Sequence, residues 1–87
     1  MPSPDAGPEA IYARRVLLEE LEDALDELPE EQREVFIDNE LLGYTFKELA
    51  EREGVGINTL LSRKHYAVKY LRSRLRAIYD EFRKGRV

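Results

Sequence analysis

The chain has 87 residues, which is enough for one small domain and leaves no room for a second. It has no cysteine, which excludes disulfides and thiolate metal sites and fits a reducing, cytoplasmic compartment. It also lacks the run of roughly 20 apolar residues that a membrane span needs, so no membrane partner is expected. The net charge of −4 hides an asymmetry, because residues 1–54 are strongly acidic and residues 55–87 are basic. This pattern indicates a polyanion partner, although two solvated helix faces would produce it as well.

The first half of the chain predicts a leader followed by two helices. Residues 1–8 hold three prolines, a glycine and a serine, which is typical of a disordered leader or a linker remnant. Residues 9–28 predict a helix, because leucines and alanines recur at helical spacing while acidic residues fill the other face. Pro29 should end this helix and occupy the first turn of the next one.

The second helix is predicted to run to about Leu42. Val35, Phe36 and Leu42 are expected to face inward, because their spacing matches one side of a helix. Gly43 then provides a residue that tolerates the left-handed conformation in which many helices end.

The stretch from Thr45 onward predicts a short helix, a tight turn and a long helix. Thr45 is a good N-cap, and Glu48 three residues later completes a capping box. The turn is expected at residues 54–56. Asn58 or Thr59 would then cap a last helix that continues to about residue 83. Leu61 and Val68, at the edge of its apolar stripe, are expected to close the core, with a partner surface as the alternative.

The break at residues 54–56 has the features of a helix-turn-helix, whose second helix can enter a DNA major groove. Ala50 is small enough for a close helix crossing, and Gly54 four residues later permits a sharp turn. Val55 and Leu60 then supply apolar contacts on either side of the bend. Strand signals are absent, so the predicted class is all-α: a four-helix domain with a C-terminal helix-turn-helix and no wing. The alternative is a plain four-helix bundle whose last two helices are tightly joined.

At these residues the chain resembles a family. The segments LDELPEEQREVF and ELLGYTFKELAEREGVGINTLLSRKHYAVKYLRSRL look like the fourth domain of bacterial sigma factors of the extracytoplasmic-function type. The resemblance covers residues 11–82 and places the helix-turn-helix at residues 45–71 of a domain spanning 9–87. It implies binding to the promoter −35 element and docking on the RNA polymerase β flap, with an anti-sigma factor as a further possible partner.

Three departures from the common family pattern affect the expected base contacts. Leu61 stands where a lysine or arginine often precedes the Ser-Arg pair, and Lys64 stands where an apolar residue often follows it. Tyr66 stands where an arginine is common. The second domain of the family, which opens the −10 element, is absent from this sequence. We therefore expect either a piece of a longer sigma factor or a solitary regulator. The proline-rich start favours the piece.

The candidate DNA-contacting residues lie at the starts of the two motif helices and along the second one. Ser62, Arg63, His65 and Tyr66 are expected to face the groove, with Arg63 bonding guanine or phosphate unless Glu48 or Glu51 holds it in an ion pair. Lys64 would add non-specific attraction. Helix starts suit phosphates. The full set is Thr45, Lys47, Asn58, Thr59, Ser62, Arg63, Lys64, His65 and Tyr66.

No catalytic, metal or cofactor site is expected. His65 is the only histidine, and without cysteine or a second histidine it cannot make a usual metal site. No nucleophile–base pair is evident, so the chain is not expected to be an enzyme. The competing hypothesis is a protein-interaction module with a sigma-like fold that binds polymerase or an anti-sigma factor without reading DNA.

Overall fold

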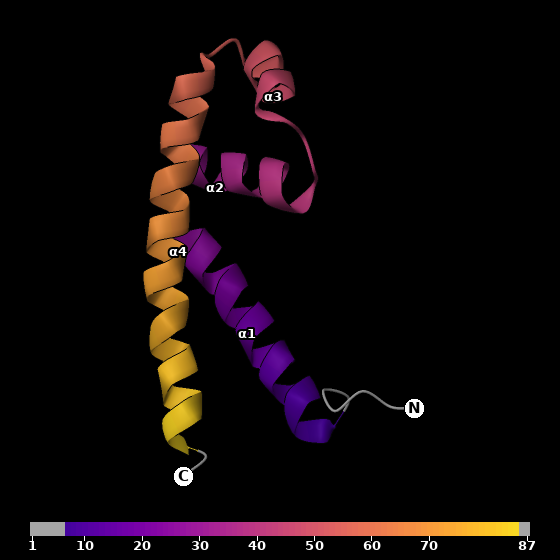
Figure 1. Cartoon of the computed structure of the whole chain (residues 1–87), viewed down its shortest axis with the longest axis vertical. Helices are drawn as coiled ribbons and strands as arrows, with labels where there is room; N and C mark the ends of the chain where they lie inside the picture. Colours follow the sequence, from indigo (N-terminus) through magenta and orange to yellow (C-terminus); the bar gives the residue numbers. More distant parts are fainter. Residues whose placement is uncertain (1–6, 86–87) are drawn as a thin grey trace.

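The computed structural model describes residues 7–85 and contains four helices, with no strand in that range. They are α1 (Pro8–Glu27), α2 (Glu30–Phe36) continued by the π-helical segment η2 (Ile37–Leu41), α3 (Phe46–Glu53) and α4 (Ile57–Gly85). Figure 1 shows α4 as a long rod against which the other three helices pack from one side. The all-α prediction with a C-terminal helix-turn-helix is therefore confirmed.

The first helix begins one residue earlier than predicted, at Pro8. Proline suits this position because an N–H in the first turn would have no partner within the helix. The remainder of the predicted leader, residues 1–6, lies outside the described residues. Leu28 is extended, at φ −78° and ψ 148°, as expected for a residue that precedes proline. Pro29 is the N-cap of α2 and not its first helical residue, and its carbonyl accepts hydrogen bonds from Gln32 and Arg33.

The end of the second helix differs from the prediction. Leu42 was expected to face inward but is 63% exposed. In η2 the backbone hydrogen bonds skip one more residue than in an α-helix, as in the bond from Leu42 N to Ile37 O at 2.9 Å. This wider turn rotates the following side chains out of the α-helical register. Gly43 has φ +83°, which confirms the left-handed stop.

Two small apolar clusters form the core, and α4 contributes to both. The first joins α1 to the middle of α4, and its buried members are Ala24, Leu25, Leu28, Ala67 and Leu71. The second joins α2, α3 and the start of α4 through Val35, Leu49 and Leu60. The helix-turn-helix therefore shares its core with α2, and both α2 and α4 connect this core to the first cluster. Leu61 was expected to close this core, but it is 45% exposed, so that prediction is wrong; Val68 is half-buried.

A polar contact joins the end of α1 to α4 beside the first cluster. Arg74 donates hydrogen bonds to both carboxylate oxygens of Glu27, and its Nη1 lies 3.5 Å from Oε2 of Glu20. Tyr70 also donates its hydroxyl hydrogen to Glu27. The bonds from Arg74, and then that from Tyr70, hold the pKa of the Glu27 carboxyl below its ordinary value of 4.5. Beyond this contact the two helices diverge (Figure 1).

Candidate nucleic-acid interface

The turn between α3 and α4 is built by two glycines with different tasks. Gly54 has φ +71°, and its N–H donates to the carbonyl of Ala50 at 2.9 Å, which ends α3. Gly56 immediately precedes α4, and its carbonyl accepts from the backbone N–H groups of Thr59 and Leu60. Val55 between them packs on the second cluster and fixes the direction of the bend.

The start of α4 corrects one prediction. Neither Asn58 nor Thr59 caps this helix, because it begins at Ile57 and both residues already lie in its first turn. Gly56 precedes the helix instead, and a glycine can adopt the extended backbone that the capping position requires. Asn58 and Thr59 are exposed, and they stand beside the N-terminal backbone N–H groups of α4.

The outer face of α4 brings together three of the predicted groove-facing residues. Ser62, His65 and Tyr66 are all exposed, and the rings of His65 and Tyr66 meet edge to face with centroids 5.6 Å apart. At about 100° per residue, these side chains lie on the side opposite the buried Leu60 and Ala67. This face carries hydroxyl, imidazole and phenol groups, which can exchange hydrogen bonds with base edges and phosphates.

Arg63 lies beside this face and not on it. Its Nη2 is 3.6 Å from Oε2 of Glu31 on α2, so the ion pair is with neither Glu48 nor Glu51. The carboxylate of Glu31 is 71% exposed, and an ion pair this long in contact with solvent is weak. A phosphate or a guanine could therefore displace Glu31 at little cost.

Lys64 points toward the other helices. Its Nζ is 2.5 Å from Oε1 of Glu40, donates to the side-chain oxygen of Asn39, and lies 5.5 Å from the centre of the Phe46 ring. Its side chain is only 20% exposed. The ammonium thus lies over an aromatic ring and is neutralised by Glu40, which explains how lysine occupies a position where an apolar residue is common.

At the start of α3, the side chain of Thr45 is already hydrogen-bonded, whereas that of Lys47 is available to a ligand. The hydroxyl of Thr45 accepts from the backbone N–H of Glu48 at 3.1 Å, and the backbone N–H of Thr45 donates to the Glu48 carboxylate at 3.3 Å, which confirms the capping box. The Thr45 hydroxyl also donates to this carboxylate at 3.0 Å. This hydroxyl would have to leave Glu48 before it could donate to a phosphate. Lys47 is exposed and has no ion pair within the part of the chain that the structure describes.

Sequence reasoning missed a set of residues that hold α3 in place. Asn39 donates from Nδ2 to the carbonyl of Tyr44 at 2.8 Å, while its oxygen accepts from Lys64. Arg52 forms an ion pair with Asp38 at 2.7 Å and lies over the Tyr44 ring at 5.1 Å. The only signal for these contacts was a polar Asp-Asn pair inside the apolar stretch of residues 35–42. Sequence reasoning also placed Leu61 in the core, whereas in the structure it is an exposed apolar side chain next to Ser62.

Carboxylates of α1, α2 and η2 form ion pairs with Arg74, Arg63 and Lys64 of α4. On α2, partial removal of Glu34 from water and then repulsion by Glu30 raise the pKa of the Glu34 carboxyl above its ordinary value. Among the described residues, no group of three or more His, Cys, Asp or Glu side chains is arranged to hold a metal ion. No helix in the same residues has the length and apolar character to cross a membrane.

Comparisons with known proteins found one family. Residues 18–77 match the family model described as sigma-70, region 4. That range includes the second half of α1, all of α2 and α3, and the part of α4 that carries the outer face. The comparisons with curated proteins and with solved structures gave no match.

Proposed function

The chain belongs to the sigma-70 region 4 family, and we propose from this membership that it binds the promoter −35 element and docks on the β flap of RNA polymerase to direct transcription initiation. Region 4 is a non-enzymatic, DNA-binding domain of sigma factors. The resemblance of residues 11–82 supports the extracytoplasmic-function type, with the cytoplasm as the place of action. One structural observation carries the DNA-reading proposal. A polar, exposed face of α4 directly follows a tight turn that packs on the second apolar cluster.

In this proposal the outer face of α4 enters the major groove. Ser62, His65 and Tyr66 probe base edges there, and the exposed Leu61 beside them suits the methyl group of thymine. The backbone N–H groups at the start of α4 and the side chain of Lys47 on α3 hold phosphates and set the register. Arg63 joins them by exchanging Glu31 for DNA.

The proposed polymerase-docking site is an apolar groove between α2 and α4 that adjoins the outer face of α4. It has a volume of about 560 Å³, and its lining residues are Phe36, Val68, Leu71, Arg72, Leu75 and Arg76. Its apolar side chains, from α2 and α4, suit an apolar segment of polymerase. Val68 would then serve as the partner surface that the sequence left as an alternative.

Selection from a random DNA pool, with the 87-residue chain tethered to polymerase, tests the proposal. We expect one short motif to be enriched, and we expect the motif to change in Ser62→Ala and His65→Ala variants. Arg15→Gln, on α1, is the matched surface control and should leave the motif unchanged. The absence of any enriched motif would refute DNA reading.

A second variant separates reading from docking. Leu75→Glu places a charge in the apolar groove, so it should weaken the association with polymerase while the isolated chain still binds the selected motif. If the outer-face variants instead weaken only the association with polymerase, the protein-interaction module becomes the correct description.

A further inference from the structure

The length of α4 exceeds what groove reading needs. Its 29 residues extend about 43 Å at 1.5 Å per residue, whereas the major groove is about 12 Å wide. The proposed reading residues end at Tyr66, the tenth residue of the helix. The rest of α4 therefore projects beyond the groove. Its exposed side can contact the DNA or protein surface that adjoins the base-reading residues.

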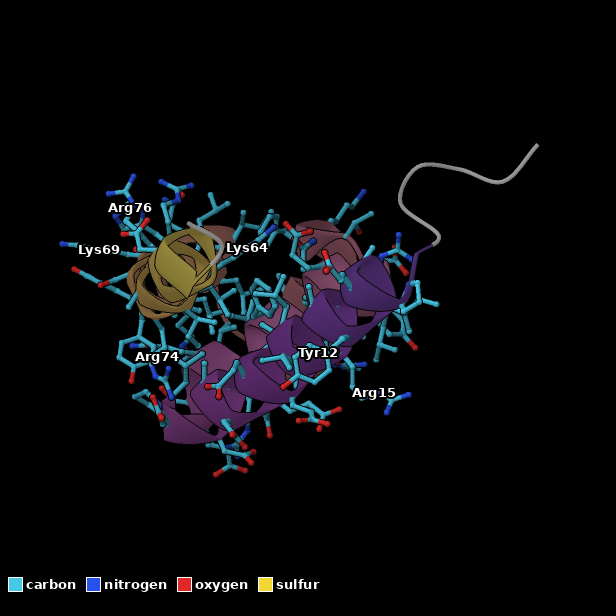
Figure 2. All side chains as sticks on the ribbon, turned by 90° about the horizontal axis from the view of Figure 1, so that it is seen from below. Tyr12, Arg15, Lys64, Lys69, Arg74 and Arg76 are labelled. Atoms are coloured by element: carbon cyan, nitrogen blue, oxygen red, sulfur yellow. The ribbon has the colours of Figure 1, made fainter. Side chains whose placement is uncertain are left out.

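The six basic residues of α4 whose side chains the structure describes fall into two groups. Arg63, Lys64 and Arg74 form ion pairs with carboxylates of α1, α2 and η2. Lys69, Arg72 and Arg76 are exposed, and the structure gives none of them an ion pair with any described residue. Figure 2, which views the molecule from below Figure 1, shows Lys69 and Arg76 projecting from the side of α4 away from α1, while Arg74 points toward α1.

The second group continues the reading face along the helix. Lys69, Arg72 and Arg76 follow His65 by four, seven and eleven residues. Residues at these spacings lie on the same side of an α-helix as His65. Together with Val68 and Ser73 they line a shallow hollow of about 300 Å³. We name Lys69, Arg72 and Arg76 the basic stripe.

We propose that the basic stripe binds the sugar-phosphate backbone of the DNA that flanks the base-read segment, so that α4 reads bases at its start and holds phosphates along its middle. This inference rests on the proposed function, because it assumes that the start of α4 lies in the groove. The three cations span about 10 Å of helix axis, a length over which duplex DNA carries about six negative charges. The ion pairs that α1 and α2 make with α4 are to Arg63 and Arg74, and none of them reaches the stripe.

The test is the salt dependence of DNA binding by the 87-residue chain. The variant Lys69→Gln/Arg72→Gln/Arg76→Gln should weaken binding to the selected motif and to a scrambled duplex by the same factor. The slope of log K against log salt should become shallower by about 0.9 for each lost phosphate contact, or by about 2 to 3 in total. The variant Lys69→Arg/Arg72→Lys/Arg76→Lys preserves every charge and should keep the original slope. Circular dichroism checks that α4 remains helical in both.

The outcomes separate this inference from the proposed function. An unchanged slope in the glutamine variant overturns the phosphate role, and a loss of polymerase association at an unchanged slope assigns the stripe to an acidic protein surface. A loss confined to one DNA sequence makes the stripe a base reader. The unmodified chain could bind all duplexes equally while the glutamine variant makes the salt slope shallower. In that case sequence reading fails and the phosphate role of the basic stripe stands.

Discussion

Arg74 donates to both carboxylate oxygens of Glu27, with Nε 3.0 Å from Oε1 and Nη2 3.1 Å from Oε2. This two-pronged contact joins the last turn of α1 to the middle of α4, next to the buried Leu28 and Leu71. An arginine can make such a planar fork and a lysine cannot. The contact also withdraws Arg74 from the cations that are available to DNA.

The contact with Arg74 makes stability depend on pH. Because the pKa of Glu27 is lower in the folded chain than its ordinary value of 4.5, its contribution is present above about pH 4.5 and is lost as pH falls through the lowered pKa. We expect Glu27→Gln to be less stable than the unmodified chain near pH 7, with the difference shrinking in acid. Urea unfolding across this range measures it. Glu22→Gln, an exposed change on the same helix, is the control, and an equal effect there would refute the role of Arg74.

The two neighbouring leucines of α4 should differ sharply in their effect on stability. Leu60 is fully buried between α2 and α3, so Leu60→Ala should lower the free energy of unfolding by about 2–5 kcal/mol. Leu61 is 45% exposed, so Leu61→Ala should change it by no more than about 0.5 kcal/mol. Chemical denaturation measures both. Similar losses in the two variants would mean that the second cluster is packed differently.

The turn glycines should respond differently to added side chains. Gly54→Ala forces a non-glycine residue to φ +71°, which costs about 1–2 kcal/mol, although no atom lies within 4 Å of the added carbon. Gly56→Ser adds a capping hydroxyl in front of α4 without a positive φ, so we expect a gain of a few tenths of a kcal/mol. Thermal unfolding compares the two. A neutral Gly54→Ala would contradict the left-handed turn.

Local features were readable from the sequence because they depend on near neighbours. The capping box of Thr45 and Glu48, the left-handed Gly43, the sharp turn at Gly54 and the end of α1 before Pro29 all involve residues a few positions apart. The apolar spacing also predicted the buried Leu60 and its contacts across the turn. Backbone geometry and helical periodicity decide these features, and both follow from the order of residues.

Which cations of α4 are free was decided by tertiary structure. The sequence placed Arg63 and Lys64 together in one basic segment, but packing turns one toward Glu31 and the other toward Asn39 and Glu40. The π-helical segment also rotated Leu42 outward. The sequence alone determined that a basic helix follows a tight turn, because propensity and spacing are local. Only the fold determined which of its charges are neutralised, because an ion pair depends on where helices distant in the chain come to lie.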